Sequence, residues 1–254
     1  MTTYTVADLT ELSLTLGQAN RDLVILAEGN TSVRLGPGRM LVKASGSTMP
    51  TASESDFVEL ETAPLLELIS SESSSDDEID AVLRAARIDP AGPRPSMEAL
   101  LHAICLEEAG ATVVAHTHPI AVNAILCSDR AETLVAGSLF PDQIVVMGRH
   151  NLLVPYADPG LALARSVRDG LRQHRARHGA PPKVVYLVNH GIFVLADSPT
   201  QALAITDMTV KSARILLGAL SAGEPRYLSD ADAERIDVRP DEVRRRERLA
   251  AVGK

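Results

Sequence analysis

The sequence predicts an α/β fold, with one domain built on a largely antiparallel sheet that helices cover. Short apolar segments typical of strands are mixed along the chain with segments of helical periodicity. The 254 residues are 45% apolar, which is enough to bury one sizeable core. We find no internal repeat and no Pro/Ser-rich linker that would divide the chain, so residues 1–254 are interpreted as a single domain.

The first part of the chain is predicted to begin with helices and to continue as a β-hairpin. Apolar residues recur at helical spacing over residues 5–27, which indicates one or two helices. Two short strands, 32–35 and 40–43, flank a turn at 36–39 that contains two glycines and a proline, a pattern typical of a hairpin. Residues 57–60 are expected to form another short strand.

Two segments are expected to lie outside the packed core. Residues 69–94 include an acidic run rich in serine, which is typical of an exposed, mobile insertion in the form of a solvated loop. From about residue 230 the chain carries mixed charges, including three consecutive arginines at 244–246. This tail is interpreted as a solvated helix or a fraying end rather than as a basic binding motif.

The second half of the chain is predicted to alternate helices with strands. Gly110 is placed to end one helix, Pro119 to open the next, and residues 198–201 resemble a capping box before a long helix. The helices are expected at residues 95–108, 119–126, 161–174 and 199–220. The strands are expected at residues 111–118, 143–147, 183–189 and 192–196.

The composition excludes several classes of protein. Lys and Arg total 25 and Asp and Glu total 33, so the net charge of −8 gives no bulk attraction for nucleic acid or anionic lipid. The first residues lack the features of a secretory signal, and no apolar run approaches the ~18 residues that span a membrane. We therefore expect a cytoplasmic protein with no nucleic-acid or membrane partner, in which Cys105 and Cys127 are buried, reduced thiols.

The clearest chemical motif is His116-Thr117-His118, at the end of a predicted strand. Residues two apart on a strand point to the same side of the sheet, so both imidazoles can reach one point in space. Two titratable rings are costly to bury side by side unless something pairs with them, and a divalent metal does so. An isolated pair of this kind is also compatible with two satisfied core or surface histidines.

His190 is interpreted as a third metal ligand, because it lies between two apolar strands and beside Gly191, which permits a tight turn. Three histidines leave coordination positions open, which is typical of a catalytic rather than a structural metal site. The sequence thus predicts a centre on His116, His118 and His190 for a metal such as Zn, Fe, Co or Ni.

Glu98 and His102 lie one helical turn apart near the start of the predicted 95–108 helix. Glu98 can be an ordinary first-turn glutamate favoured by the helix dipole, a general acid/base or a reserve metal ligand, and the residues alone leave these alternatives open. His102 is interpreted as an orienting or packing residue rather than a ligand.

Two loops of small polar residues, 29–32 and 45–47, combine backbone N–H groups with hydroxyls and therefore suit phosphate oxygens. Each is also compatible with an ordinary turn. Three further histidines lie in polar, Arg-containing contexts and are interpreted as surface residues: His150, His174 and His178.

Taken in order, these motifs resemble one known family. They are Gly-Asn-Thr-Ser at 29–32, Ser-Gly-Ser at 45–47, Pro-Ser-Met-Glu with a later histidine at 95–102, His-Thr-His-Pro at 116–119 and Asn-His-Gly at 189–191. The ordered set resembles the class II aldolase/adducin family over roughly residues 8–228. That family includes fuculose-1-phosphate and rhamnulose-1-phosphate aldolases and ribulose-5-phosphate 4-epimerase.

The resemblance implies a three-layer α/β/α fold and a homotetramer with active sites at subunit interfaces. It implies one divalent metal per subunit, Zn²⁺ first, with Mn²⁺, Co²⁺, Ni²⁺ or Fe²⁺ as alternatives. Glu98 matches the acid/base glutamate of the aldolases, whereas the epimerase has aspartate there, so retro-aldol cleavage of a ketose 1-phosphate to dihydroxyacetone phosphate and an aldehyde is favoured. The expected substrate and phosphate contacts are Asn30, Thr31, Ser45, Gly46 and Ser96.

The chain also departs from the family pattern. Met97 stands where the aldolases often have serine, and it cannot donate a hydrogen bond to phosphate. Tyr227 is the tyrosine near the C-terminus and is the candidate proton donor, while residues 119–155 contain no tyrosine. Decarboxylase, dehydratase and epimerase activities are therefore alternatives. A non-catalytic, adducin-like scaffold is disfavoured because all three histidines are present.

Overall fold

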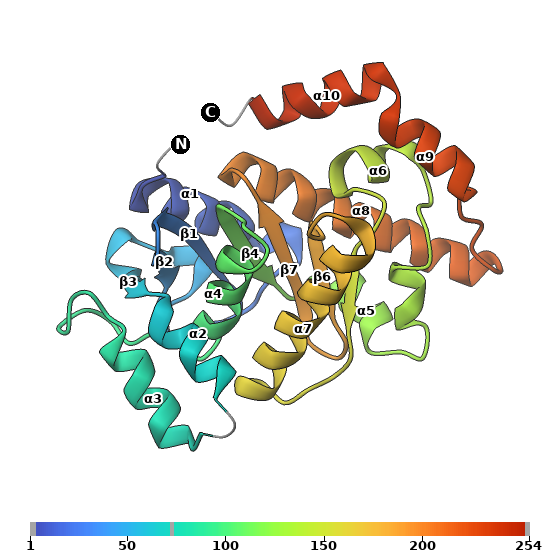
Figure 1. Ribbon diagram of the computed structural model, residues 1–254. Helices are drawn as coiled ribbons and strands as arrows, with labels where there is room; N and C mark the ends of the chain where they lie inside the picture. The colour runs from blue at the N-terminus through green and yellow to red at the C-terminus, as the bar shows by residue number, and fades with distance from the viewer. Residues whose placement is uncertain (1–3, 72–73, 252–254) are drawn as a thin grey trace.

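The computed structural model describes residues 4–71 and 74–251, which form a seven-stranded sheet between helices (Figure 1). The strands are β1 (Asn30–Gly36), β2 (Arg39–Lys43), β3 (Phe57–Glu61), β4 (Val113–Thr117), β5 (Leu152–Val154), β6 (Val184–Leu187) and β7 (Gly191–Ala196). The α-helices are α1 (Val6–Leu16), α2 (Ala63–Ser70), α3 (Asp76–Ala85), α4 (Ala99–Glu107), α5 (Ile120–Leu126), α6 (Pro141–Met147), α7 (Leu161–His178), α8 (Pro199–Ala222), α9 (Asp230–Val238) and α10 (Pro240–Ala251). Short 3-10 turns occupy Ala19–Arg21, Met49–Thr51, Glu54–Asp56 and Ala131–Leu134.

The strand order in the sheet is β3-β2-β1-β4-β7-β6-β5. Neighbouring strands are antiparallel except for β5 and β6, which are parallel. The predicted hairpin is β1–β2, and the prediction of a largely antiparallel sheet is confirmed. In the ladders around the central strand β4, His116 pairs with Asn30 on one side and with Phe193 on the other. Segments far apart in the sequence therefore meet at the same end of the sheet.

Different helices cover the two faces of the sheet and give the expected three layers (Figure 1). Helices α2, α4 and α7 pack on one face, and α1, α5 and α8 pack on the other. Alternation along the strands explains the division, because Val114 and Phe193 belong to the first core while Val113 and Val194 belong to the second. His116 follows Val114 by two residues and therefore faces the α4 side.

The strand predicted at 143–147 is wrong, because these residues belong to α6. Pro141 lies in the first turn of that helix, and Ile144 and Val145 pack against apolar residues of α9. A short apolar run fits a buried helix as well as a strand, and periodicity alone does not separate them. The edge strand on this side of the sheet is β5 instead.

The loop predicted within residues 69–94 is wrong for 76–85, which form α3. Ser75 and Glu78 form a capping box, in which the Ser75 backbone N–H donates to the Glu78 carboxylate at 2.8 Å. Ile79 and Leu83 are buried against the core, so one face of this acidic helix is packed. Residues 72 and 73 lie outside the described part, and mobility of the insertion stays a prediction.

The two cysteines differ in their surroundings. Cys105 is buried in α4, as predicted, and burial raises the pKa of its thiol to about 12. Cys127 is exposed, so the prediction for it is wrong: it caps the C-terminal end of α5 at the surface. Among the described residues, no helix combines the length and the apolar character needed to cross a membrane. The cytoplasmic location stays a prediction.

Candidate metal centre

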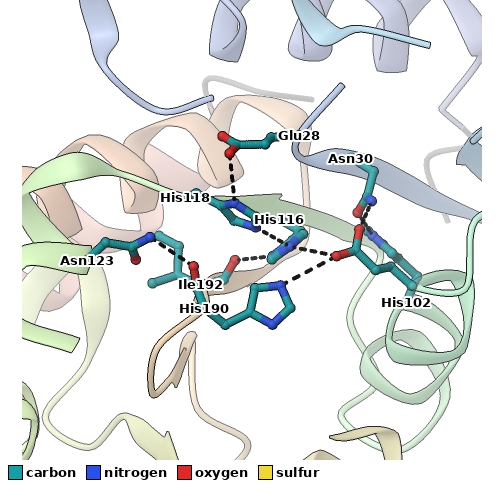
Figure 2. Close-up of polar contacts among 9 residues, drawn as sticks. Glu28, Asn30, His102, His116, His118, Asn123, His190 and Ile192 are labelled. Atoms are coloured by element: carbon teal, nitrogen blue, oxygen red, sulfur yellow. Dashed lines mark hydrogen bonds and ion pairs between the residues drawn. The ribbon is translucent and has the colours of Figure 1, made fainter. Parts of the chain in front are cut away.

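Three histidines and a glutamate converge at one end of strands β4 and β7 (Figure 2). His116 is buried within β4, His118 follows the end of that strand, and His190 lies in the turn between β6 and β7. Because Thr117 pairs with Ile192, the β4–β7 ladder brings the turn that carries His190 beside the end of β4.

The four side chains offer a compact set of metal ligands. The Nε2 atoms of His116 and His118 are 3.0 Å apart. Oε1 of Glu98 lies 3.3 Å from Nε2 of His116 and 3.5 Å from Nε2 of His190. The four ligand atoms all lie within 4.8 Å of one another, so the group could hold a metal ion. The structure thus brings together the three histidines that the sequence singled out, with Glu98 beside them.

Contacts at Nδ1 hold the rings of His116 and His118 so that their Nε2 atoms face the centre. Nδ1 of His116 donates to the Ile192 carbonyl at 2.8 Å, which leaves Nε2 facing the centre. Nδ1 of His118 faces a carboxylate oxygen of Glu28 at 3.7 Å, and the other oxygen of Glu28 accepts from the Ile25 N–H at 3.1 Å. Carboxylates and carbonyls hold metal-binding histidines in this way in many proteins. Glu28 was not identified from the sequence, where its only signal is its place beside the 29–32 motif.

Close packing fixes the same rings. Phe193 stacks on His116, with ring centroids 4.2 Å apart. A Cβ added to Gly191 would lie 2.6 Å from Cδ2 of His118. Gly29 has a φ of +71°, and a Cβ there would lie 2.8 Å from the His116 carbonyl oxygen. Both positions therefore require glycine.

The electrostatics of the group suit a divalent cation. Burial lowers the pKa of His118 to about 3, with the charges of His116 and His190 acting in the same direction, so this ring is neutral and able to bind metal. Burial raises the pKa of Glu98, but the charge of His116 and the hydrogen bonds from His116, His190 and Asn30 outweigh it and hold that pKa well below its ordinary value. Neutral nitrogen donors and one anionic oxygen are ligands that Zn²⁺ and related metals accept.

The β1 residues expected at the substrate lie on opposite faces of the strand. The Asn30 amide donates to Glu98, and its oxygen contacts His102. Thr31 points the other way, and its hydroxyl is hydrogen-bonded to Ser13 in the core at 2.7 Å. The structure therefore brings Asn30 to the centre, while the Thr31 hydroxyl does not join it.

The remaining expected contacts lie in and beside the loop after β2. Ser45 and Gly46 are exposed, and the Ser45 N–H donates to the Arg94 carbonyl at 2.9 Å, which joins this loop to the segment before Ser96. Within the described part of the chain, the buried Oγ of Ser96 has no hydrogen-bond partner. An open cavity of about 400 Å³ beside Ser45 is lined in part by acidic residues of α3, so the insertion borders this loop.

Lys43 is a second residue that sequence reasoning missed. Its side chain is buried at the end of β2, and Nζ donates to the carbonyl oxygens of Ser47 at 2.5 Å and Ala44 at 3.3 Å. Burial lowers the pKa of Lys43, and the nearby carboxylates of Glu98 and Asp56 partly offset this. The lysine ties the 45–47 loop to the sheet. In the sequence, the feature that could have identified it is a charged residue at the end of an apolar strand, directly before that loop.

Tyr227 lies away from these contacts in its own chain. Its hydroxyl donates to the Thr133 carbonyl at 2.8 Å, and a Cβ added to Gly137 would touch its ring. No contact between the described residues joins Tyr227 to the histidines of the centre.

The other histidines are grouped near the C-terminal end of α7. His150 and His178 are exposed, as predicted. His174 is buried, so the surface interpretation is wrong for it: Nδ1 contacts the Ala180 carbonyl at 3.0 Å, where the chain turns back after the helix.

Two relatives resemble this chain in sequence. It is 30% identical over 159 residues to the uncharacterized oxidoreductase YuxG of Bacillus subtilis (strain 168), a match that covers 63% of this chain and 21% of YuxG. The chain thus spans about a fifth of the length of that relative. It is 25% identical over 232 residues to 3-oxo-tetronate 4-phosphate decarboxylase of Haemophilus influenzae, which covers 90% of this chain and 96% of that protein.

A solved structure and a family model also match this chain. The structure of an L-fuculose 1-phosphate aldolase aligns with a TM-score of 0.65 at 23% identity, over 91% of this chain and 95% of that one, and so has the same fold. The family model described as Class II Aldolase and Adducin N-terminal domain matches residues 7–217. Because this match covers most of the chain and includes every residue of the centre, the chain belongs to the class II aldolase and adducin N-terminal domain family.

Proposed function

We propose that this protein is a metal-dependent lyase that cleaves the carbon–carbon bond between the α and β carbons of a carbonyl group in a sugar or sugar phosphate. The observation that carries the proposal is the convergence of His116, His118 and His190 with an ionised Glu98. Three imidazoles leave coordination positions open for a substrate, as a catalytic metal site requires. Membership of a family composed mostly of lyases supports the proposal.

The three histidines are the proposed metal ligands. Zn²⁺ is the first choice because it prefers nitrogen ligands in a tetrahedral arrangement, and Mn²⁺, Co²⁺, Ni²⁺ and Fe²⁺ are alternatives. A bound divalent cation supplies Lewis-acid polarisation of a substrate carbonyl and stabilises the negative charge that develops there. The Ile192 carbonyl and the Glu28 carboxylate keep His116 and His118 oriented for binding.

Glu98 is the proposed proton carrier. Its carboxylate is ionised, so it can accept a proton from the substrate and return it to a substrate carbon. In retro-aldol cleavage the C4 hydroxyl loses its proton and becomes the aldehyde. The electrons of the broken C3–C4 bond remain on the ketone fragment, and C3 takes up a proton. At 3.3 Å from Nε2 of His116, Glu98 can also serve as a reserve ligand in the absence of substrate.

A ketose 1-phosphate is the proposed substrate, with dihydroxyacetone phosphate and an aldehyde as products. Ser45, Gly46 and Ser96 are the proposed phosphate contacts. An exposed turn with backbone N–H groups and a buried hydroxyl that lacks a partner suit phosphate oxygens. The side chain of Met97, which is 40% exposed, adds no donor to this set.

A homotetramer with its active sites at subunit interfaces is the proposed assembly. Ile25, Leu26 and Ile120 are 64%, 81% and 64% exposed, and Ile120 follows His118 by only two residues. Large exposed apolar side chains favour burial against another subunit. In such an assembly Tyr227 is proposed to act at the site of a neighbouring chain.

Decarboxylation is the second candidate reaction. It is favoured by the full-length similarity to a 3-oxo-tetronate 4-phosphate decarboxylase. Loss of CO₂ also leaves negative charge next to a carbonyl group, but it requires no base for a departing aldehyde.

Product analysis with purified, metal-loaded protein tests the proposal. We would offer a panel of ketose 1-phosphates and, separately, 3-oxo sugar-acid phosphates. Formation of dihydroxyacetone phosphate that a chelator abolishes supports the aldolase. Release of CO₂ that a chelator abolishes supports the decarboxylase. Metal-loaded protein that cleaves neither class of substrate would contradict a carbon–carbon lyase.

A further inference from the structure

A line of hydrogen bonds runs from the interior of the protein to the carboxylate of Glu98, and Figure 2 shows the part that joins His102 to Asn30. The hydroxyl of Ser32 lies 2.6 Å from Nδ1 of His102. Nε2 of His102 contacts the side-chain oxygen of Asn30, and the Asn30 amide donates to Oε2 of Glu98. The other oxygen of Glu98 faces His116. Each group is thus hydrogen-bonded to the next one in the line.

The direction of every bond follows from the orientation of the Asn30 amide. Its NH₂ group donates to Oε2 of Glu98, which leaves its oxygen facing His102. An oxygen can only accept from the ring, so Nε2 of His102 carries the proton. Burial lowers the pKa of His102 to about 3, so the ring is neutral and its Nδ1 has no proton. The Ser32 hydroxyl must then donate to Nδ1.

We propose that Ser32 and His102 are positioning residues, which fix the orientation of the Asn30 amide so that it holds Glu98 against the metal ligands. The proposal rests on the proposed function through the role of Glu98 as proton carrier. The line does not carry protons, because an amide in its middle neither gains nor loses one under ordinary conditions. Its effect is geometric, since one of the two carboxylate oxygens is anchored and the other is left facing the centre.

The packing around His102 supports a fixed ring. His102 is fully buried, and it contacts Phe193 edge-on with ring centroids 5.3 Å apart. Phe193 also stacks on His116, so a single aromatic side chain lies against both the positioning residue and a metal ligand. Without the His102 donor the Asn30 amide could rotate and present its oxygen to the carboxylate, and two acceptors would then face each other in a buried site.

Both polar groups of Asn30 are occupied in this arrangement. The resemblance to aldolases implied that Asn30 binds phosphate, whereas the structure assigns its side chain to Glu98. An Asn30→Ala variant should therefore lower kcat more than it raises KM, because it removes an interaction with the proton carrier rather than with the substrate.

The protonation of His102 provides a test that is independent of activity. In Zn²⁺-loaded protein labelled with ¹⁵N-histidine, the ring nitrogen shifts of His102, assigned by their loss in His102→Gln, report which nitrogen carries the proton. We expect the neutral form with the proton on Nε2, unchanged between pH 6 and pH 8, which lies well above the pKa of about 3. A proton on Nδ1 would reverse the direction of the line and overturn the proposal, whatever reaction the protein catalyses.

Two matched variants then test the effect on turnover, with whichever substrate the panel identifies. Glutamine offers an NH₂ donor and a carbonyl acceptor, so His102→Gln should keep most of kcat. His102→Leu offers neither and should lower kcat by about 10- to 100-fold with little change in KM or in bound metal, because a displaced catalytic group costs on this order. Equal loss in both variants, or loss of metal in parallel with kcat, would reduce His102 to a packing residue. Unchanged turnover in Glu98→Gln, with the proton on Nε2 of His102 in the wild-type protein, would contradict the role of Glu98 instead.

Discussion

Gly191→Ala tests whether the backbone of β7 fixes the position of a metal ligand. The new Cβ would lie 2.6 Å from Cδ2 of His118 and 2.6 Å from the Thr117 carbonyl oxygen, whereas ordinary contacts begin at 3.4 Å. The neighbours must therefore retreat by about 0.8 Å, and the ring of His118 moves more easily than the backbone of β4. Metal–ligand distances tolerate only about 0.2 Å, so this ring should leave its binding position.

We expect the affinity of the Gly191→Ala variant for Zn²⁺ to fall by about 10- to 100-fold, measured by competition with a fluorescent chelator. The free energy of unfolding of the metal-free variant, from urea denaturation, should fall by about 1–3 kcal/mol because the site is overpacked. Gly218→Ala in α8 is the matched control, since its Cβ would meet nothing within 4 Å. The control should keep its affinity and gain about 0.5–1 kcal/mol. Wild-type affinity and stability in Gly191→Ala would refute this reasoning.

Three further changes probe other parts of the molecule. Glu98→Gln should retain bound metal by elemental analysis yet lose about 100-fold or more in kcat, and unchanged turnover would rule out its role as proton carrier. Glu28→Gln should weaken Zn²⁺ binding by about 10-fold in chelator competition, because the acceptor that faces Nδ1 of His118 becomes uncharged; equal affinity would leave Glu28 without this role. Burial lowers the pKa of Lys183 from 10.5 to about 8. Between pH 8 and pH 10.5 the unfolded chain therefore binds more protons than the folded protein. The free energy of unfolding should rise with pH over this range, by up to about 1.4 kcal/mol per pH unit. Urea denaturation of Lys183→Met should lack this rise, and parallel curves for the two proteins would contradict it.

Local patterns were sufficient where a short-range interaction decides the structure. The turn at 36–39 defined the β1–β2 hairpin, and Pro119 marked the start of the α5 segment. The motif around His116 and His118 predicted that two rings share one side of a strand end, because side-chain direction alternates along any strand. Local patterns failed at 143–147, where an apolar run is compatible with both a strand and a buried helix and only the contact with α9 decides between them.

By itself the sequence determined the α/β class, the antiparallel character of the sheet and the family, and it singled out the three histidines and Glu98 as candidate site residues. Only the tertiary structure decided which neighbours these residues have. The pairing of β1 with β4 placed Asn30 beside Glu98, and the packing of α4 on the sheet placed His102 beside Asn30. Glu28 and Lys43 gave little signal in the sequence, because a single charge acquires a role only from the groups that surround it in space. Strand pairing and helix packing join residues far apart in the chain, and no local pattern encodes those distances.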